Sequence, residues 1–149
     1  MGKVVEIGVG YNKGGKIQNV NKVEAVKGQG LLNDRKFAKD NQKESQITLI
    51  EIENIYYFNN KYKTNIPPID FRSNIITKDI RLNELIGKEL IVGNVKLKAH
   101  DLCRPCKYLQ NKLKQNNFIK EFLRKGGLRC EILTNGNINV GDIIKLKND

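Results

Sequence analysis

Two cysteines and the chain's only histidine make one short segment the richest in reactive side chains. Residues 100–107 read His-Asp-Leu-Cys-Arg-Pro-Cys-Lys, which spaces His100, Cys103 and Cys106 three positions apart. A thiolate is both a nucleophile and a soft metal ligand, and neighbouring basic residues favour it over the thiol. Three kinds of chemistry are therefore open to this segment: thiol–disulfide exchange, zinc binding, or the chemistry of a single thiolate.

Thiol–disulfide exchange would use Cys103 and Cys106 as a thioredoxin-type Cys-x-x-Cys pair, whose thiol pKa the adjacent basic residues and a following helix would lower. In a thioredoxin fold this motif lies early in the chain, and a proline later in the sequence contacts it. Here the motif lies two-thirds along the chain, and no proline follows Pro105. The order of motifs therefore favours another interpretation.

Structural zinc would need a fourth ligand, and Cys130 would complete a Cys₃His set with His100, Cys103 and Cys106. Cys130 lies in an apolar strand, however, where a lone cysteine usually packs in the core. A chain of this length also buries enough surface to fold without a metal. The remaining interpretation is a single functional thiolate beside a basic pocket.

The elements that position this segment are mostly short strands joined by tight turns. Apolar runs and turn residues predict seven or eight strands, including a Gly93-Asn94 hairpin with a type II′ turn, and about two helices. We expect a mainly β fold with peripheral helices, a mixed or antiparallel barrel rather than a parallel βαβ architecture. The expected strands are 4–9, 20–26, 47–50, 71–77, 90–92, 95–97, 128–133 and 143–146, and the expected helices are 52–62 and 107–123.

Composition limits the partners of this protein. The chain has 149 residues, which predicts one domain over 1–149, and 27 basic against 16 acidic residues give a net charge of +11. Such a charge attracts nucleic acids, nucleotides, phosphorylated cofactors and oxyanions. A basic nucleic-acid-binding barrel is the less favoured alternative, because the largest group of aromatic residues, four of ten, falls in the 56–62 helix and aromatic stacking platforms on strands are not evident. With no long apolar run and no signal-like N-terminus, we expect a cytoplasmic protein without a membrane partner.

Six segments in order resemble the MOSC domain family, which forms the C-terminal module of molybdenum cofactor sulfurases and also occurs alone in bacteria. Residues 30–35, Gly-Leu-Leu-Asn-Asp-Arg, resemble the family's Gly-Leu-x-Gly-Asp-Arg, and Ser-Gln-Ile-Thr-Leu-Ile at 45–50 resembles Arg-Gln-Val-Thr-Leu-Ile. Residues 71–77 resemble Phe-Arg-x-Asn-Ile-x-Thr, and Gly93-x-Val95-x-Leu97 follows. Cys-Arg-Pro-Cys at 103–106 and Gly-Gly-Leu-Arg at 126–129, with its trailing Gly-Asp at 141–142, complete the match.

The resemblance implies a MOSC-type β-barrel that binds a molybdenum cofactor, a molybdopterin. Cys106 matches the family's signature cysteine, which is proposed to ligate molybdenum or carry sulfur. Arg72 and Asn74 match the segment that shapes the cofactor pocket. Since planar guanidinium groups bind phosphate bidentately, the candidate phosphate-binding residues are Arg35, Arg72, Arg104 and Arg129.

The resemblance also implies an activity and its partners. In relatives, the bound cofactor supports two-electron reduction of N-hydroxylated compounds. An external electron donor would be needed here, because the sequence has no flavin, haem or iron–sulfur motif. Sulfur transfer with a sulfur-donor protein is the neighbouring expectation. The pyridoxal-phosphate domain of full sulfurases does not fit within 149 residues, so we expect no pyridoxal phosphate site.

Three positions depart from the family pattern. Asn33 replaces a glycine in the first segment, but asparagine tolerates a left-handed backbone, so we expect the turn to survive. Lys36 stands where the family usually has histidine, and Ser45 stands where arginine is common. These two changes alter the contacts expected with a bound anion.

Overall fold

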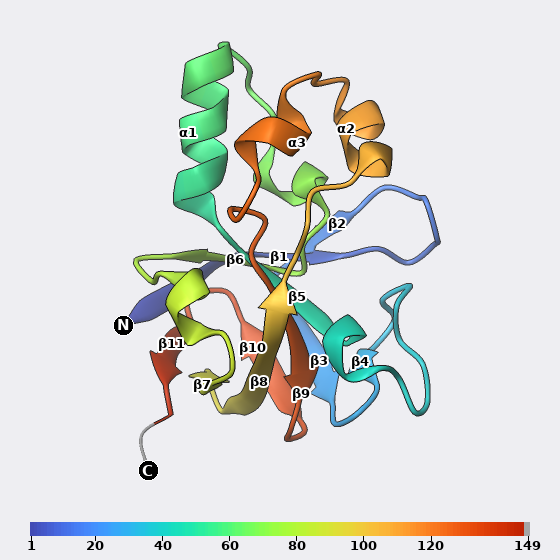
Figure 1. Ribbon diagram of the computed structural model, residues 1–149. Helices are drawn as coiled ribbons and strands as arrows, with labels where there is room; N and C mark the ends of the chain where they lie inside the picture. The colour runs from blue at the N-terminus through green and yellow to red at the C-terminus, as the bar shows by residue number, and fades with distance from the viewer. Residues whose placement is uncertain (148–149) are drawn as a thin grey trace.

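Seven strands close into a barrel in the computed structural model, which describes residues 1–147 (Figure 1). Closure comes from the pairing of the last strand, β11, with the first, β1. Around the barrel the order is β1 (Gly2–Val9), β11 (Ile143–Leu146), β7 (Glu89–Val92), β8 (Val95–Leu102), β9 (Leu128–Ile132), β5 (Ile47–Glu51) and β6 (Ile75–Lys78). A closed barrel leaves no unpaired edge strand along its wall.

Four further strands lie outside this ring. β2 (Gln18–Val20) pairs with β1, and a second sheet has the order β10 (Gly136–Asn139), β3 (Lys22–Val26), β4 (Gly30–Leu31). Alternate side chains of β8 and β9 point into the barrel, as the period of a strand requires. Their interior residues join Val23, Leu31 and Ile138 from the second sheet in one apolar core.

The helices gather at one end of the barrel (Figure 1). They are α1 (Ile52–Tyr62), α2 (Lys107–Leu113) and α3 (Phe118–Glu121). The chain also has three short 3-10 turns, η1 (Lys43–Ser45), η2 (Pro68–Phe71) and η3 (Leu82–Leu85). A separate apolar cluster, built around Phe58, Phe71, Phe118 and Phe122, lies between the helices and the sheet. Over residues 1–147, no helix has the length and apolarity required to span a membrane.

The expected mixed barrel with peripheral helices is confirmed, and it contains one parallel pair of strands. β5 and β6 are parallel neighbours, and α1 connects them, so this part of the chain is a βαβ unit within an otherwise antiparallel barrel. A mixed barrel includes such a pair, and the expectation against an overall parallel βαβ architecture also holds. The expected helix 52–62 between two apolar strands was the sequence signal for this pair, because a parallel pair needs a long crossover.

Several predicted boundaries change in the structure. The strand expected from Phe71 begins only at Ile75, because η2 precedes it and Arg72 has a left-handed backbone with φ 68°. The single helix expected over 107–123 is two helices, since Lys114 is left-handed with φ 57°. The strand expected over 20–26 is two strands that meet at Asn21.

Candidate functional site

A cavity of about 230 Å³ lies between the helices and the end of the barrel, and it is lined by cations, thiols and aromatic rings. Ile50 of β5, Phe71, Phe118 and Phe122 form its apolar wall. None of its lining residues within 1–147 is an aspartate or glutamate, so the cavity favours a ligand that is negatively charged and partly apolar. Its charged and thiol-bearing residues are Arg35, Lys36, Arg72, Arg104, Cys103 and Cys106.

The cysteine loop follows the end of β8, where the strand is irregular. The register of β8 against β9 shifts between Ala99 and Asp101, and bulges of this kind redirect the end of a strand. After β8, the Cys103 N–H donates to the Gly127 carbonyl at 2.8 Å, which ties the loop to β9. Cys106 then precedes α2 in an extended conformation. The loop thereby carries both thiols to the cavity wall.

The three thiols differ in exposure, and this separates their chemistry. Cys106 is exposed, Cys103 is half-buried and Cys130 lies in the barrel core, as expected from its apolar strand. Burial raises the pKa of Cys103 to about 11, although the charges of Lys36 and Arg129 oppose the rise. Burial also raises the pKa of Cys130. Cys106 is therefore the thiol best placed to react with a ligand or a partner protein.

The Cys₃His zinc alternative is not supported by the arrangement of these residues. His100 Nε2 lies 2.8 Å from Glu131 Oε1, and Cys130 points into the barrel interior. Within residues 1–147, no group of three or more His, Cys, Asp or Glu side chains comes close enough to hold a metal ion. For the thiol-exchange alternative, the helix that was expected to follow the Cys-x-x-Cys pair is present: α2 begins directly after Cys106.

The Asn33-Asp34-Arg35 turn has the conformation that the sequence predicts. Asn33 adopts φ 71°, so asparagine replaces glycine at a left-handed position. Asp34 is only 4% exposed; its Oδ1 accepts from the Gly10 N–H at 2.9 Å and lies 3.2 Å from Arg35 Nη1. This buried carboxylate holds Arg35 against the cavity, so the pair is more than a surface ion pair.

Asn74 supports the cavity without lining it, because its side chain is 1% exposed and its amide bonds to the protein. Its Oδ1 accepts from the Thr48 N–H at 3.1 Å and from Lys36 Nζ at 3.1 Å. Its Nδ2 donates to the Gly8 carbonyl at 3.1 Å. Asn74 thus joins β1, β5 and the segment after β4, and it holds the lysine that lines the cavity.

The arginines predicted from the sequence have different surroundings. Arg72 lines the cavity, donates to the Gly15 carbonyl at 2.8 Å and lies over the Tyr108 ring at 5.9 Å. Arg104 lies at the mouth, where its exposed guanidinium bonds to Asp101 at 2.6 Å. The structure does not bring Arg129 into the lining; its Nε donates to the Glu44 carbonyl at 3.0 Å.

Arg72 also borders a second, adjoining cavity of about 340 Å³. Lys16 and Lys112 lie on its walls, and Lys112 Nζ donates to the Gly14 carbonyl at 3.1 Å. The first cavity is smaller than most pockets that enclose a drug-sized ligand. Arg72 is common to both cavities, and Asp70 lies with the two lysines on the wall of the second.

Lys36 is the site residue that sequence reasoning did not assign. Its half-buried side chain lines the cavity, and burial lowers its pKa to about 8. The charges of Arg35 and Arg129 add to this lowering, whereas those of Asp34 and Cys103 oppose it. The sequence feature that could have identified Lys36 is its departure from the family pattern, where histidine usually follows the Asp34-Arg35 pair.

Replacing Lys36 with methionine is expected to stabilise the protein at pH 7 by about 1–3 kcal/mol. The pKa of Lys36 in the folded protein, about 8, is below the ordinary lysine value of 10.5. Below pH 8 the lysine is charged in both states, and its burial as an ammonium then lowers the free energy of unfolding. This cost disappears as the pH rises from about 8 towards 10.5. Urea unfolding of both proteins at a series of pH values should show a difference that shrinks above pH 8. An equal difference at every pH would contradict the pKa assignment.

Comparisons with known proteins identify the family of this fold. The family model for the MOSC domain matches residues 28–145. The YuaD protein from Bacillus subtilis is similar in structure, with a TM-score of 0.80 at 20% identity, over 97% of this chain and 94% of that one. YiiM from Geobacillus stearothermophilus has a TM-score of 0.79 at 18% identity, over 99% and 76%.

YiiM from Escherichia coli is a third similar structure, with a TM-score of 0.76 at 14% identity, over 100% of this chain and 71% of that one. The comparison with curated protein sequences gave no match. At these identities the solved structures show the shared fold alone. The family model, which covers most of the sequence, shows the family: this chain belongs to the MOSC domain family.

Proposed function

We propose that this protein binds a molybdenum cofactor in the cavity beside Cys106 and uses the Cys106 thiolate as a molybdenum ligand or as a sulfur carrier. The observation that supports this most directly is the composition of one cavity wall. An exposed thiol lies there with four cationic side chains, and no carboxylate lines the cavity within the described residues.

The residues present fit the chemistry of such a cofactor. A thiolate is a suitable ligand for a soft transition metal, and Cys106 presents its sulfur at the mouth of the cavity. Arg35 and Arg72 offer guanidinium groups to a phosphate, and the aromatic wall offers Phe71 and Phe118 to a flat pterin ring. When bound, the cofactor supplies a metal centre for two-electron redox chemistry.

Each of these residues has a separate task. Arg35 and Arg72 fix the position of the ligand through its negative charge, and Asp34 holds Arg35 in place. The aromatic cluster excludes water from one side of the cavity. Reduction of an N-hydroxylated substrate consumes two electrons and two protons and releases water. An external electron-donor protein would supply the electrons at the exposed mouth beside Cys106.

Sulfur transfer is the second use of the same thiolate, and the exposure of Cys106 favours it. The thiolate attacks the outer sulfur of a donor protein's persulfide, and the donor's sulfur–sulfur bond breaks. The donor leaves as a thiolate, and Cys106 carries the persulfide with no net oxidation. Intact-mass measurement after incubation with a persulfide donor should show the added mass of one sulfur atom in native protein and none in Cys106→Ser.

Metal and pterin analysis tests the proposed cofactor. The native chain is expressed without oxygen in a host that makes the cofactor, beside Cys106→Ser and the matched variant Cys103→Ser. We expect near-stoichiometric molybdenum with pterin in native protein, at least a tenfold loss in Cys106→Ser, and retention in Cys103→Ser. Molybdenum that survives in Cys106→Ser would contradict the role of this thiolate. A native protein without molybdenum and pterin would contradict cofactor binding.

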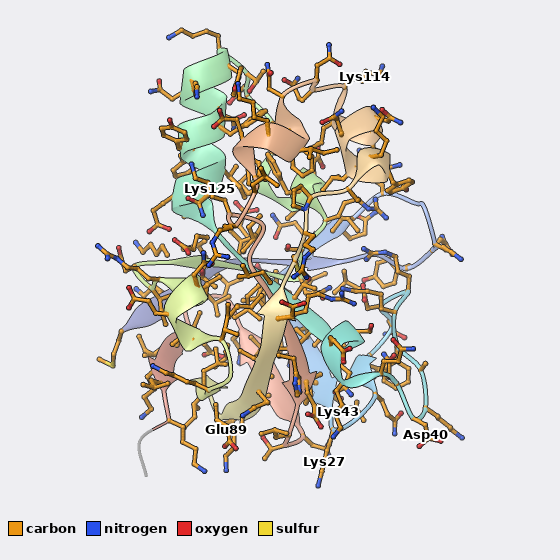
Figure 2. All side chains as sticks on the ribbon, in the orientation of Figure 1. Lys27, Asp40, Lys43, Glu89, Lys114 and Lys125 are labelled. Atoms are coloured by element: carbon orange, nitrogen blue, oxygen red, sulfur yellow. The ribbon has the colours of Figure 1, made fainter. Side chains whose placement is uncertain are left out.

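The net charge alone does not favour the nucleic-acid alternative. Figure 2 shows Lys27 and Lys43 at the end of the molecule opposite Lys114, which lies near the helices. These three lysines therefore lie at two ends of the molecule and not along one strand surface. The aromatic residues Tyr56 and Tyr57 are exposed on α1, away from the strands that would form a stacking platform.

A further inference from the structure

One wall of the cavity carries hydrogen-bond donors from residues to which the proposed function gives no role, Lys36 and Ser73. Lys36 Nζ donates to Asn74 Oδ1 at 3.1 Å, which uses one of its three N–H groups. Its other two N–H groups have no protein partner among residues 1–147. The nearby Asp34 carboxylate accepts from the Lys36 main-chain N–H and is not paired with the ammonium.

Ser73 is a second donor of this kind. Its side chain lines the cavity, the residue is 7% exposed, and its hydroxyl makes no hydrogen bond within the described part of the chain. No buried side-chain oxygen or nitrogen among residues 1–147 lacks a partner, so the Ser73 hydroxyl is open to the cavity and free to donate to a ligand there. Lys36 is hydrogen-bonded to Asn74, and Ser73 precedes Asn74 in the chain, so both donors belong to the same part of the cavity wall.

The charges around Lys36 make this wall selective for an anion. The ionisable groups that face it are Asp34, Arg35, Arg129 and the Cys103 thiol. Asp34 is already engaged with Arg35, and a thiol of raised pKa carries no charge near pH 7. The local balance is therefore positive, and an anion would offset the cost of holding the ammonium in a half-buried position.

We propose that Lys36 and Ser73 form an oxyanion subsite that binds one tetrahedral oxyanion, such as a phosphate group. A lysine ammonium is a compact point charge with several donors, and a hydroxyl adds a neutral donor beside it. The oxyanion is either free in solution or the phosphate monoester of a larger ligand. This subsite does not depend on metal binding at Cys106, so the two proposals can fail separately.

Isothermal titration of the full-length chain, produced in a host that makes no molybdenum cofactor, tests the subsite with inorganic phosphate as the probe. We expect Lys36→Met to weaken phosphate binding at least tenfold and Ser73→Ala to weaken it severalfold. The control Lys27→Met removes the same charge at the far end of the molecule (Figure 2) and should change the affinity less than twofold. Equal affinities in Lys36→Met and Lys27→Met, or no phosphate binding by native protein, would overturn the subsite.

Two further titrations identify the source of the oxyanion and show how its binding depends on the charge of Lys36. Tighter binding of glycerol phosphate than of inorganic phosphate assigns the subsite to a monoester, and the reverse order assigns it to a free oxyanion. Sulfate, which does not titrate near neutrality, isolates the charge of Lys36. Its affinity should fall as the pH rises through about 8 in native protein and stay level in Lys36→Met. A fall of equal size in both proteins would contradict the role of Lys36.

Discussion

Gly127→Ala is expected to destabilise the protein by about 3–5 kcal/mol, which corresponds to a fall in Tm of about 10 °C. Gly127 has φ 94°, and a methyl group there would collide with the Leu49 carbonyl oxygen and approach Ile50 Cα to 2.9 Å. These are main-chain atoms of β5, so no side-chain rotation can relieve the overlap. The neighbouring strands would have to separate where β5 pairs with β9.

Gly28→Ala is the matched control for this substitution. Gly28 also has a positive φ, 73°, but a methyl group built there meets no atom within 4 Å. It should cost only the backbone strain, about 1 kcal/mol. Thermal unfolding of both variants separates strain from collision. Equal losses of stability would show that β5 and β9 accommodate the methyl group.

A change at Gly127 should also disturb the cysteine loop. Its carbonyl accepts the Cys103 N–H, and the preceding residue, Gly126, packs so closely on Cys103 that an added methyl group would collide with the Cys103 carbonyl. We expect Gly127→Ala to weaken molybdenum retention at Cys106, because the Gly127 carbonyl ties the cysteine loop to β9. The Gly-Gly pair therefore supports the site through close packing.

Asn74→Ala is expected to cost about 2–4 kcal/mol of folding free energy. The substitution removes an amide that accepts from the Thr48 N–H and from Thr48 Oγ1 and that donates to the Gly8 carbonyl. The Thr48 N–H and the Gly8 carbonyl would each lose a side-chain partner. Urea unfolding measures the loss, and it should exceed that of most single polar substitutions.

The control for Asn74 is Asn83→Ala. Asn83 Nδ2 donates to the Arg124 carbonyl at 2.7 Å at the surface, so its loss should cost about 0.5 kcal/mol. Because Asn74 also holds Lys36, Asn74→Ala should weaken phosphate binding, whereas Asn83→Ala should not. A stable Asn74→Ala protein with native phosphate affinity would contradict both the supporting role of Asn74 and the position of Lys36.

Local sequence patterns predict much of the secondary structure of this fold. Ile52, Ile55 and Phe58 follow helical spacing and are buried on one face of α1, where the sequence predicts a helix over the same residues. The Gly93-Asn94 hairpin forms between β7 and β8, and Gly93 has φ 62°, as a type II′ turn requires. The family motifs also identified the MOSC domain before any geometry was known.

Boundaries set by long-range contacts did not follow from local patterns. The helical periodicity of 107–123 continues through Lys114, but the chain turns there, and Phe118 and Phe122 then pack against Phe58 and Phe71. The aromatic rings that pack against Phe118 and Phe122 belong to residues about 50 to 60 positions earlier in the sequence. No local propensity contains that information.

Residue types and their spacing are enough to predict the mainly β class, the thiol-bearing loop and the positive charge of the protein. Which of the predicted groups meet depends on how the barrel closes. The fold places Arg35, Arg72, Arg104 and Cys106 around one cavity, keeps Arg129 outside its lining, and buries Asn74 behind it. The surroundings of Lys36 likewise depend on barrel closure, since a pKa depends on burial and on charges brought near by the fold.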